Sequence, residues 1–233
     1  MEKGYTVRTM QTYEVEIKSL LGSREAADAL RARFHEVDPE HKLTGASKQL
    51  NHYFHTGPMD VLHERVTSIV PQHEHPRLTH IIQNGKSFSV RTRQADDVVL
   101  LVIKASIDDT TSENGISRIE FESAVPHSLN VLDDLLVEAG FPYQAKWSRE
   151  REEYAVKGVT VTIDKNAGYG YVAELEKVVN LPEHVPTARE ELRALMQTLG
   201  IEELPQDRLE RMFAHYNEHW PAYFGTDNIF TIH

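Results

Sequence analysis

The sequence contains no cysteine and is short of positive charge. Its 233 residues hold 36 Asp and Glu against 25 Lys and Arg, a formal net charge of -11. Without cysteine, neither disulfides nor thiolate metal ligands hold the fold together, and redox chemistry gives no indication of the compartment. The acidic balance argues against wholesale binding of nucleic acid, which normally requires a basic face, and leaves room only for a local basic site.

Long apolar segments are also missing. The N-terminal residues Met1 to Gly4 contain no apolar signal core, and no segment approaches the roughly 18 to 20 apolar residues of a membrane span. We therefore expect a cytoplasmic protein that contacts neither a membrane nor nucleic acid. Apolar residues form 40% of the chain, which is enough for the core of one large domain.

Apolar residues recur at helical spacing in several segments. Ala27, Leu30 and Phe34 predict a helix over 23–36, with Ser23 as its N-cap. Two short helices are expected within 58–84, the first beginning at the proline and the second ending before a glycine. Further helices are predicted at 129–139, 190–199 and 208–219.

Between these helices, apolar and polar residues alternate in the manner of β-strands. The predicted strands cover residues 13–18, 48–56, 87–93, 98–105, 115–123, 145–156, 159–164 and 169–178. Turn signals such as Lys157-Gly158 join the later strands as hairpins. We therefore predict an α+β fold in which eight strands form an antiparallel β-barrel, or a strongly curved sheet, with peripheral helices.

The first strand carries a uniform charged face. Glu14, Glu16 and Lys18 point to one side of the strand, while Val15 and Ile17 point to the other. Later strands repeat this pattern with charges of both signs. The residues are Arg91, Arg93, Lys104, Arg118, Glu120, Glu122, Arg149, Arg151, Asp164, Glu174 and Glu176.

Two arrangements explain such faces. For any single strand, a charged face that points to solvent is the simpler explanation. If all of these strands pointed their charges to solvent, however, the outer surface would have few neutral polar residues, which makes this arrangement less favoured. In an inverted barrel, the apolar faces pack outward against the helices and the charged faces line a central tunnel. Buried charges need partners. Arg and Lys suit phosphate oxygens and carboxylates suit Mg²⁺ or Mn²⁺, so a polyphosphate bound with metal uses both sets.

Taken in order, these motifs resemble the signature of the CYTH family, the triphosphate tunnel metalloenzymes. The family's Glu-x-Glu-x-Lys is met at Glu14, Glu16 and Lys18. The other matching positions are Arg91, Arg93, Lys104, Arg118, Glu120, Glu122, Arg149, Arg151, Tyr154, Asp164, Gly168, Gly170, Glu174 and Glu176. The stretch from Gln49 to Phe54 is similar to the Gln-x-Asp-x-Tyr-Phe of the class IV adenylyl cyclase branch, with Asn51 in place of Asp.

The resemblance implies a tunnel that binds a triphosphate-bearing small molecule together with Mg²⁺ or Mn²⁺. The implied metal ligands are Glu14, Glu16, Asp164, Glu174 and Glu176. The implied phosphate-binding residues are Lys18, Arg91, Arg93, Lys104, Arg118, Arg149 and Arg151. Lys18, Glu120 and Glu122 are the candidate catalytic residues, and no residue stands out as the general base. The resemblance is also compatible with a homodimer.

Three functions fit this site. A metal-dependent triphosphatase, acting on inorganic, nucleoside or thiamine triphosphate, needs only the tunnel and a water that attacks the terminal phosphorus. An adenylyl cyclase, in which the ribose 3′-hydroxyl attacks the α-phosphorus, also needs an adenine pocket, which no residue identifies. A non-catalytic polyphosphate-binding module is the third. Both reactions are in-line displacements at phosphorus in which positioning and charge stabilisation dominate, and hydrolysis is the leading interpretation.

The tunnel domain should cover residues 1–180, with a helical insertion at about 58–84. Residues 181–233 add C-terminal helices and an aromatic-rich tail. Its apolar members are Met212, Phe213, Tyr216, Trp220, Tyr223, Phe224 and Phe230. Such residues usually pack a terminal helix onto the barrel, although a dimer contact or a cap over one tunnel mouth would use the same composition.

Overall fold

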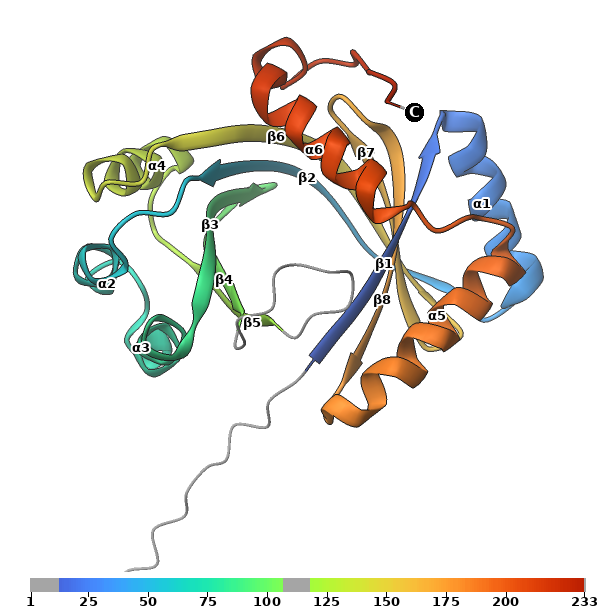
Figure 1. Ribbon diagram of the computed structural model, residues 1–233, viewed down its shortest axis with the longest axis horizontal. Coiled ribbons are helices and arrows are strands. Elements are labelled where there is room, and N and C mark those ends of the chain that lie inside the picture. Colours follow the sequence, from blue (N-terminus) through green and yellow to red (C-terminus); the bar gives the residue numbers. More distant parts are fainter. Residues whose placement is uncertain (1–12, 107–117, 233) are drawn as a thin grey trace, which may run out of the picture.

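Eight strands and six α-helices form the described part of this computed structural model, which covers residues 13–106 and 118–232 (Figure 1). The strands are β1 (Tyr13–Gly22), β2 (Lys42–Phe54), β3 (Lys86–Ala95), β4 (Val98–Ser106), β5 (Arg118–Ala124), β6 (Tyr143–Val156), β7 (Val159–Asn166) and β8 (Gly170–Val179). The helices are α1 (Arg24–Val37), α2 (Met59–Thr67), α3 (His75–Asn84), α4 (Leu129–Glu138), α5 (Val185–Leu199) and α6 (Gln206–His219). None of these described helices has the length and apolar character needed to cross a membrane. The predicted α+β class with eight strands is confirmed.

All eight strands belong to one antiparallel sheet, in the order β1-β8-β7-β6-β2-β3-β4-β5. The long strands β2 and β6 pair with each other and join the two halves of the sheet (Figure 1). Among the described residues, no backbone pairing joins the edge strands β1 and β5. An ion pair at 3.6 Å connects Glu14 on β1 to Lys104 on β4, the strand next to the other edge. The predicted barrel is therefore a strongly curved sheet whose ring is not closed by backbone hydrogen bonds.

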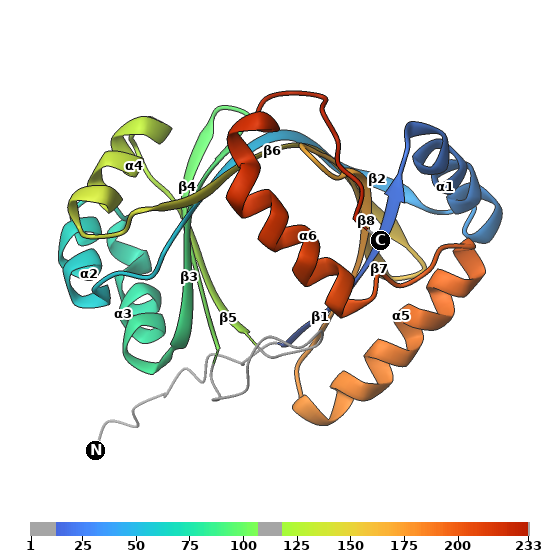
Figure 2. The ribbon, with the colours of Figure 1, turned by 45° about the horizontal axis from the view of Figure 1, so that its top comes forward.

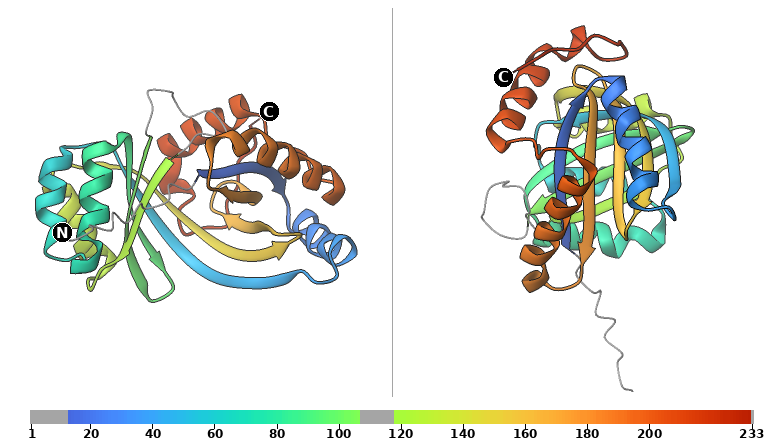
Figure 3. Two further views of the ribbon diagram at one scale, coloured as in Figure 1. Left: turned by 90° about the horizontal axis from the view of Figure 1, so that it is seen from below. Right: turned by 90° about the vertical axis from the view of Figure 1, so that its right-hand side faces the viewer.

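Helices cover the outer face of the sheet in two groups (Figure 3). One group, α2, α3 and α4, packs on β3, β4 and β5 around Leu62, Leu78 and Leu132, which are fully buried. The other, α1 and α5, packs on β1, β7 and β8 around the buried Phe34 and Leu192. Removal of these apolar side chains from water holds the helices to the sheet. The charged faces of the strands are thereby left on the opposite side.

Local sequence signals fix where several elements begin. Ser23 caps α1, as predicted, by accepting a hydrogen bond from the backbone N–H of Ala26 at 3.2 Å. Gly170 begins β8 with a positive φ of 72°, and a Cβ atom there would collide with the carbonyl oxygen of Gly22. Only glycine therefore fits where the start of β8 passes the end of β1.

Some element boundaries differ from the prediction. β2 begins at Lys42 rather than at residue 48, because its first residues pair with β6 while their side chains stay exposed, so no apolar alternation marks them. α5 begins at Val185 rather than at residue 190, with Pro186 in its first turn. The strand predicted over 115–123 is β5, and residues 115–117 lie outside the described residues.

A buried polar network anchors α4 to the outer face of β2 and β3. Asp133 is 1% exposed and accepts hydrogen bonds from Thr92 at 2.5 Å and Tyr143 at 2.8 Å. Nδ1 of His52 lies 2.7 Å from the same carboxylate. Burial opposes ionisation of Asp133, but these partners lower its pKa. The network lies on the side of the sheet away from the charged faces.

In contrast to the other helices, α6 packs on the inner face of the sheet, the face that carries the charged residues (Figure 2). Trp147 on β6 is the cross-strand neighbour of Asn51 on this face. Tyr216 of α6 stacks on Trp147 with ring centroids 3.5 Å apart. The Tyr216 hydroxyl also donates a hydrogen bond to the carbonyl oxygen of Lys146 at 2.8 Å. The aromatic side chains of α6 thus contact the sheet, while the division of the chain at residue 180 stays a prediction.

Candidate active site

The charged residues singled out in the sequence share the inner face of the sheet. Along β1, Val15 and Ile17 are fully buried against the helices, whereas Glu14 and Lys18 keep 34% and 19% of their side-chain surface exposed. The same alternation brings to this face Arg91, Arg93, Lys104, Glu120, Glu122, Arg149, Arg151, Asp164, Glu174 and Glu176. The charged interior predicted for the fold is confirmed. Arg118 begins β5, but its side chain lies outside the described part of the structure.

Three arginines on β3 and β6 form a group that we call the arginine wall: Arg91, Arg93 and Arg149. Each guanidinium donates a hydrogen bond to an uncharged side chain on the inner face of β2. The pairs are Arg91 with the Tyr53 hydroxyl at 2.7 Å, Arg93 with the Asn51 amide oxygen at 2.9 Å, and Arg149 with the Gln49 amide oxygen at 2.8 Å. Sequence reasoning gave these three β2 residues no role, although their spacing by two signals a shared face.

Asp164 lies at the centre of a buried ion-pair network. Its side chain is fully buried, and Arg151 donates hydrogen bonds to both carboxylate oxygens at 2.7 and 2.6 Å. Arg149 donates to Asp164 at 3.2 Å, and Arg151 also donates to Glu174 at 2.7 Å. Burial opposes the charge of Arg151, but the bonds to Asp164 and Glu174 raise its pKa. Because both oxygens of Asp164 bind arginine, its assignment as a metal ligand stays a prediction.

The positive charge of the arginine wall is incompletely compensated at two of its three members. Burial opposes the charge of Arg91, but Tyr53 and Glu120, the latter at 3.6 Å, raise its pKa. Burial and the nearby charge of Arg91 lower the pKa of Arg93 to about 10, even though Glu122 binds Arg93 at 2.8 Å. Burial and the charge of Arg151 also lower the pKa of Arg149. A lowered pKa means that the protonated form is less stable here than in water. An anion bound beside these guanidiniums would relieve that cost.

Lysines bind the carboxylates on the neighbouring strands, in a group that we call the lysine pairs. The pairs are Lys18 with Glu16 and with Glu174 (2.8 Å), and Lys104 with Glu120 (2.9 Å) and with Glu14 (3.6 Å). The four carboxylates keep 19% to 34% of their side-chain surface exposed. Burial opposes ionisation of Glu174, but Lys18 and Arg151 hold its pKa well below the usual range. Glu174 is therefore ionised, and all four carboxylates are reachable from solvent.

Glu176 is the acidic residue of this region that forms no ion pair with the described residues. Burial raises its pKa, and the like charge of Glu14 raises it further. Glu176 also lies directly opposite Glu16 in the pairing of β8 with β1. A divalent cation would relieve this repulsion, and carboxylate oxygens are the ligands that Mg²⁺ and Mn²⁺ prefer. Within the described residues, no three acidic or histidine side chains converge as a metal site.

Besides the Tyr169 hydroxyl in the turn before β8, two polar atoms of strand residues on the inner face are buried and lack a hydrogen-bond partner among the described residues. They are Nε of Arg91 and Oγ1 of Thr162, the cross-strand neighbour of Glu174. A buried donor that is left unpaired costs free energy, so such atoms are uncommon unless a ligand or water completes them. The Arg91 Nε–H therefore indicates where a ligand oxygen would bind.

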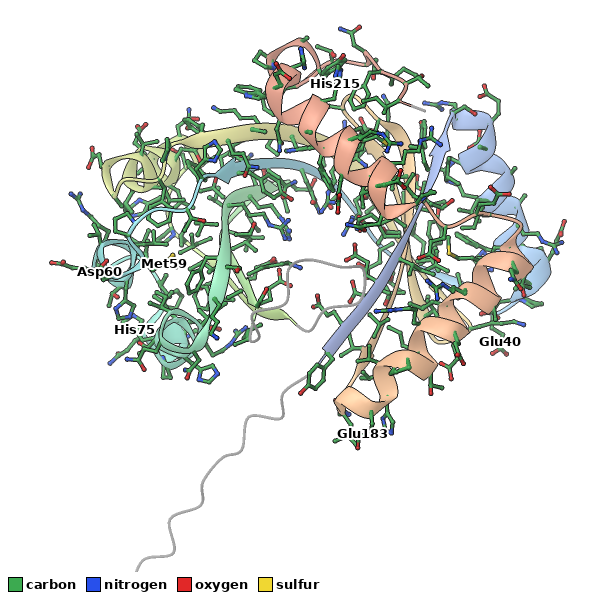
Figure 4. The ribbon with its side chains drawn as sticks, viewed as in Figure 1. Glu40, Met59, Asp60, His75, Glu183 and His215 are labelled. Atoms are coloured by element: carbon green, nitrogen blue, oxygen red, sulfur yellow. The ribbon has the colours of Figure 1, made fainter. Side chains whose placement is uncertain are left out.

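The helical insertion contributes to the outer layer of the molecule. Figure 4 shows Asp60 on α2 and His75 at the start of α3 in this layer, with Asp60 directed away from the sheet. Nε2 of His75 lies 3.0 Å from the carbonyl oxygen of Val70, within the insertion itself. The buried residues of α2 and α3 belong to the apolar core on the outer face of the sheet, and α3 lies against β4 and β5.

Comparisons with known proteins agree with this geometry. The family model described as CYTH domain matches residues 75–208, more than half of the chain. A conserved hypothetical protein from Pyrococcus furiosus is similar in structure, with 19% identity, a TM-score of 0.60, and coverage of 84% of this chain and 98% of that one. No match is found among the sequences of curated proteins.

Two further structures resemble this chain. One is a protein from Pyrococcus horikoshii OT3, with 22% identity, a TM-score of 0.57, and coverage of 87% of this chain and 99% of that one. The other, from Vibrio parahaemolyticus, is provisionally named an adenylate cyclase, with 16% identity, a TM-score of 0.57, and coverage of 87% and 98%. At these identities the likeness shows a shared fold. The CYTH family as a whole includes metal-dependent triphosphatases and adenylyl cyclases that bind triphosphates in a tunnel.

Proposed function

The chain belongs to the CYTH domain family, and we propose that it is a divalent-metal-dependent phosphohydrolase acting on a triphosphate. The substrate would be inorganic, nucleoside or thiamine triphosphate, bound along the inner face of the sheet. The observation that carries the proposal is the arginine wall, in which Nε of Arg91 is buried without a partner. Guanidinium groups match phosphate oxygens in geometry and charge, and the wall presents three of them on β3 and β6, the two strands that flank β2.

The remaining basic residues extend this phosphate site. Arg151 is fixed by Asp164 and Glu174, so it would contribute charge from a rigid position. Lys18 and Lys104 have flexible stems and bind carboxylates that stay partly exposed, and both would turn to phosphate oxygens when a ligand arrives. Arg118 is proposed as a further phosphate contact from its sequence position alone.

Glu14, Glu16, Glu174 and Glu176 would hold Mg²⁺ or Mn²⁺, and Asp164 is the fifth proposed ligand. The cation would supply charge neutralisation and Lewis-acid polarisation of the phosphoryl oxygens. The raised pKa of Glu176, caused by burial and by Glu14, supports this assignment because a bound cation stabilises the ionised carboxylate.

The reaction would be an in-line displacement at the terminal phosphorus by water, with negative charge spread over the phosphoryl oxygens. Lys18 would lie beside the reacting phosphate and stabilise that charge. Glu120 lies 2.9 Å from Lys104, and Glu122 lies 2.8 Å from Arg93, so both would orient basic residues. The chain's contribution is therefore mainly positioning and electrostatic stabilisation.

The direct test incubates the full chain with inorganic triphosphate, ATP and thiamine triphosphate in the presence of Mg²⁺ or Mn²⁺. Release of orthophosphate from at least one of them, lost when the metal is chelated, is the expected result. Binding of all three without any product would overturn the proposal and identify a polyphosphate-binding module instead.

Adenylyl cyclase activity is the second candidate. It is favoured by the stretch from Gln49 to Phe54, which is similar to that of the class IV cyclases, and by the provisional name of the structural neighbour from Vibrio parahaemolyticus. Formation of cyclic AMP and pyrophosphate from ATP in the same incubation would assign this activity. A homodimer and a cytoplasmic location stay predictions.

A further inference from the structure

The inner face of β2 carries three uncharged side chains at alternate positions, each of which binds one guanidinium. In the pairing with β3, Asn51 lies directly opposite Arg93, and Tyr53 lies opposite Arg91. In the pairing with β6 on the other side, Gln49 lies directly opposite Arg149. Because cross-strand neighbours are held at fixed spacing, these contacts set the direction of the guanidiniums.

The two amides are built into the site. Gln49 is 8% exposed and Asn51 is 3% exposed, so both are buried next to charged groups. The Gln49 Nε2 donates to Oγ of Ser47 at 2.9 Å, which leaves Oε1 to accept from Arg149. The amide is therefore held at both ends, and its oxygen faces the arginine.

An amide oxygen and a carboxylate oxygen both accept a hydrogen bond from a guanidinium, but they differ in charge. Arg151 is held by two carboxylates, Asp164 and Glu174, which compensate its positive charge. Each guanidinium of the arginine wall has one carboxylate partner, Glu120 for Arg91 (3.6 Å), Glu122 for Arg93 (2.8 Å) and Asp164 for Arg149 (3.2 Å). Its second acceptor comes from β2 and brings no formal charge. A second carboxylate in that place would fix the geometry equally well but would weaken the attraction for an anion.

We propose that Gln49, Asn51 and Tyr53 are positioning residues that aim the arginine wall at phosphate oxygens while keeping the site positively charged. As a result, they make the site prefer the more highly charged phosphate chain, triphosphate over pyrophosphate. The inference rests on the proposed function, because it assumes that this face binds phosphate. It assigns specificity to residues that touch the arginines rather than to the arginines alone.

The test replaces each amide by the carboxylic acid of the same shape, in Asn51→Asp and Gln49→Glu. Each variant keeps an acceptor for the arginine and adds one negative charge. Binding of inorganic triphosphate and of pyrophosphate to the full chain is measured by calorimetry without added metal. We expect the dissociation constant for triphosphate to rise about tenfold or more. The dissociation constant for pyrophosphate should rise less. The ratio of the two constants, which expresses the preference for triphosphate, should therefore become smaller.

A merely structural role predicts a different result. If the amides served only to hold the arginines, the carboxylates would hold them at least as well, thermal stability would be kept or raised, and affinity would not fall. Unchanged triphosphate affinity in both folded variants would therefore overturn the inference. Since the two substitutions lie next to different arginines, either one alone tests it if the other does not fold.

The control variant is Gln197→Glu, which makes the same change of charge at an exposed position of α5. It should bind both ligands as the unaltered chain does. Failure of the proposed function is visible separately, as the absence of orthophosphate release from every triphosphate by the unaltered chain. If the unaltered chain releases orthophosphate but Asn51→Asp and Gln49→Glu bind triphosphate with unaltered affinity, the inference is wrong. The proposed function would then still hold.

Discussion

The arginine wall and the lysine pairs occupy the same inner face but hold their charges in different ways. Arg149 binds the amide of Gln49 and the fully buried Asp164, so its position is fixed before any ligand arrives. Lys18 binds Glu16 and Glu174, both of which keep part of their surface in water. The arginine wall would therefore bind an anion without rearrangement, whereas the lysines would have to exchange their partners.

The difference follows from the chemistry of the two side chains. A planar guanidinium with several donors can bind a structural partner and a ligand at the same time. An ammonium on a flexible stem is a point charge that moves easily from one oxygen to another. Arginine therefore suits the permanent part of a phosphate site, and lysine suits the part where metal and ligand displace existing ion pairs.

The largest expected effect is a loss of stability in the variant Asp164→Asn, which changes the buried carboxylate beside Arg149 and Arg151. The substitution leaves Arg149 and Arg151 largely buried without their shared carboxylate. Loss of one partner from a buried ion pair typically costs about 3–5 kcal/mol, and we expect a decrease of this size in the free energy of unfolding by urea. If Asp164→Asn unfolded at the same urea concentration as the unaltered chain, the buried Asp164 would not be what fixes the arginines in place.

The control for this measurement is Asp227→Asn. Asp227 binds Lys165 at 2.6 Å but is 85% exposed, so this ion pair is screened by water. We expect no measurable change in the urea midpoint for this variant.

The second prediction concerns the lysine pairs and affects activity rather than stability. In the double variant Glu14→Gln with Glu16→Gln, the proposed metal site loses two charges, and we expect orthophosphate release to fall on the order of a hundredfold or more. Because both side chains are one-third exposed, the free energy of unfolding should change by less than about 1 kcal/mol. Full metal-dependent activity in this variant would show that these glutamates are not the metal ligands.

A smaller effect on stability is expected at the contact between α6 and the inner face of the sheet. Tyr216→Phe keeps the ring that stacks on Trp147 but removes the hydrogen bond to the carbonyl of Lys146. A buried hydrogen bond contributes about 1 kcal/mol, which should appear as a lower thermal midpoint. The KM for triphosphate should stay within about twofold, since no charge changes. A large rise in KM would mean that α6 takes part in binding.

The smallest expected effect is a pH dependence of stability that comes from Tyr53, the partner of Arg91 in the arginine wall. Burial opposes ionisation of Tyr53, but Arg91 and Arg149 outweigh it and lower its pKa to about 8, from about 10 in an unfolded chain. Between these values the folded protein binds fewer protons, so the free energy of unfolding gains a contribution that is complete above about pH 10 and is lost as the pH falls through about 8.

The affinity for triphosphate should change in the opposite direction to the free energy of unfolding over the same pH range. The phenolate adds negative charge beside Arg91, so triphosphate affinity should fall as the pH rises above about 8. Tyr53→Phe should lack this fall, and near-ultraviolet absorbance follows the ionisation directly. An identical pH profile in both proteins would show that ionisation of Tyr53 does not affect the arginine wall.

Much of the fold could be predicted because its signals are local. The alternation in Glu14-Val15-Glu16-Ile17-Lys18 defines both a strand and its charged face. Ser23 marks the start of α1 through a side-chain cap that acts over a single turn. Gly85 follows the last residue of α3 in an extended conformation. The first part of β2 was missed because its exposed side chains show no alternation, and only its pairing with β6 reveals the strand.

The candidate site was only partly predictable because its contacts join residues far apart in the chain. The spacing of Gln49 and Asn51 indicates a shared face, but the arginines that they bind lie on β6 and β3. Asp164 stands in an acidic motif that suggests a metal ligand, yet in the fold its oxygens bind Arg149 and Arg151. Neither partnership leaves a trace in local sequence.

The sequence by itself therefore determined that this protein builds a sheet with one apolar and one charged face, because side chains of a strand alternate between its two sides whatever the rest of the chain does. Tertiary structure decided which charge meets which partner. The order of the strands places β2 between β6 and β3 and β8 beside β1. That order sets the uncharged side chains of β2 beside the arginine wall and sets Lys18 beside Glu174.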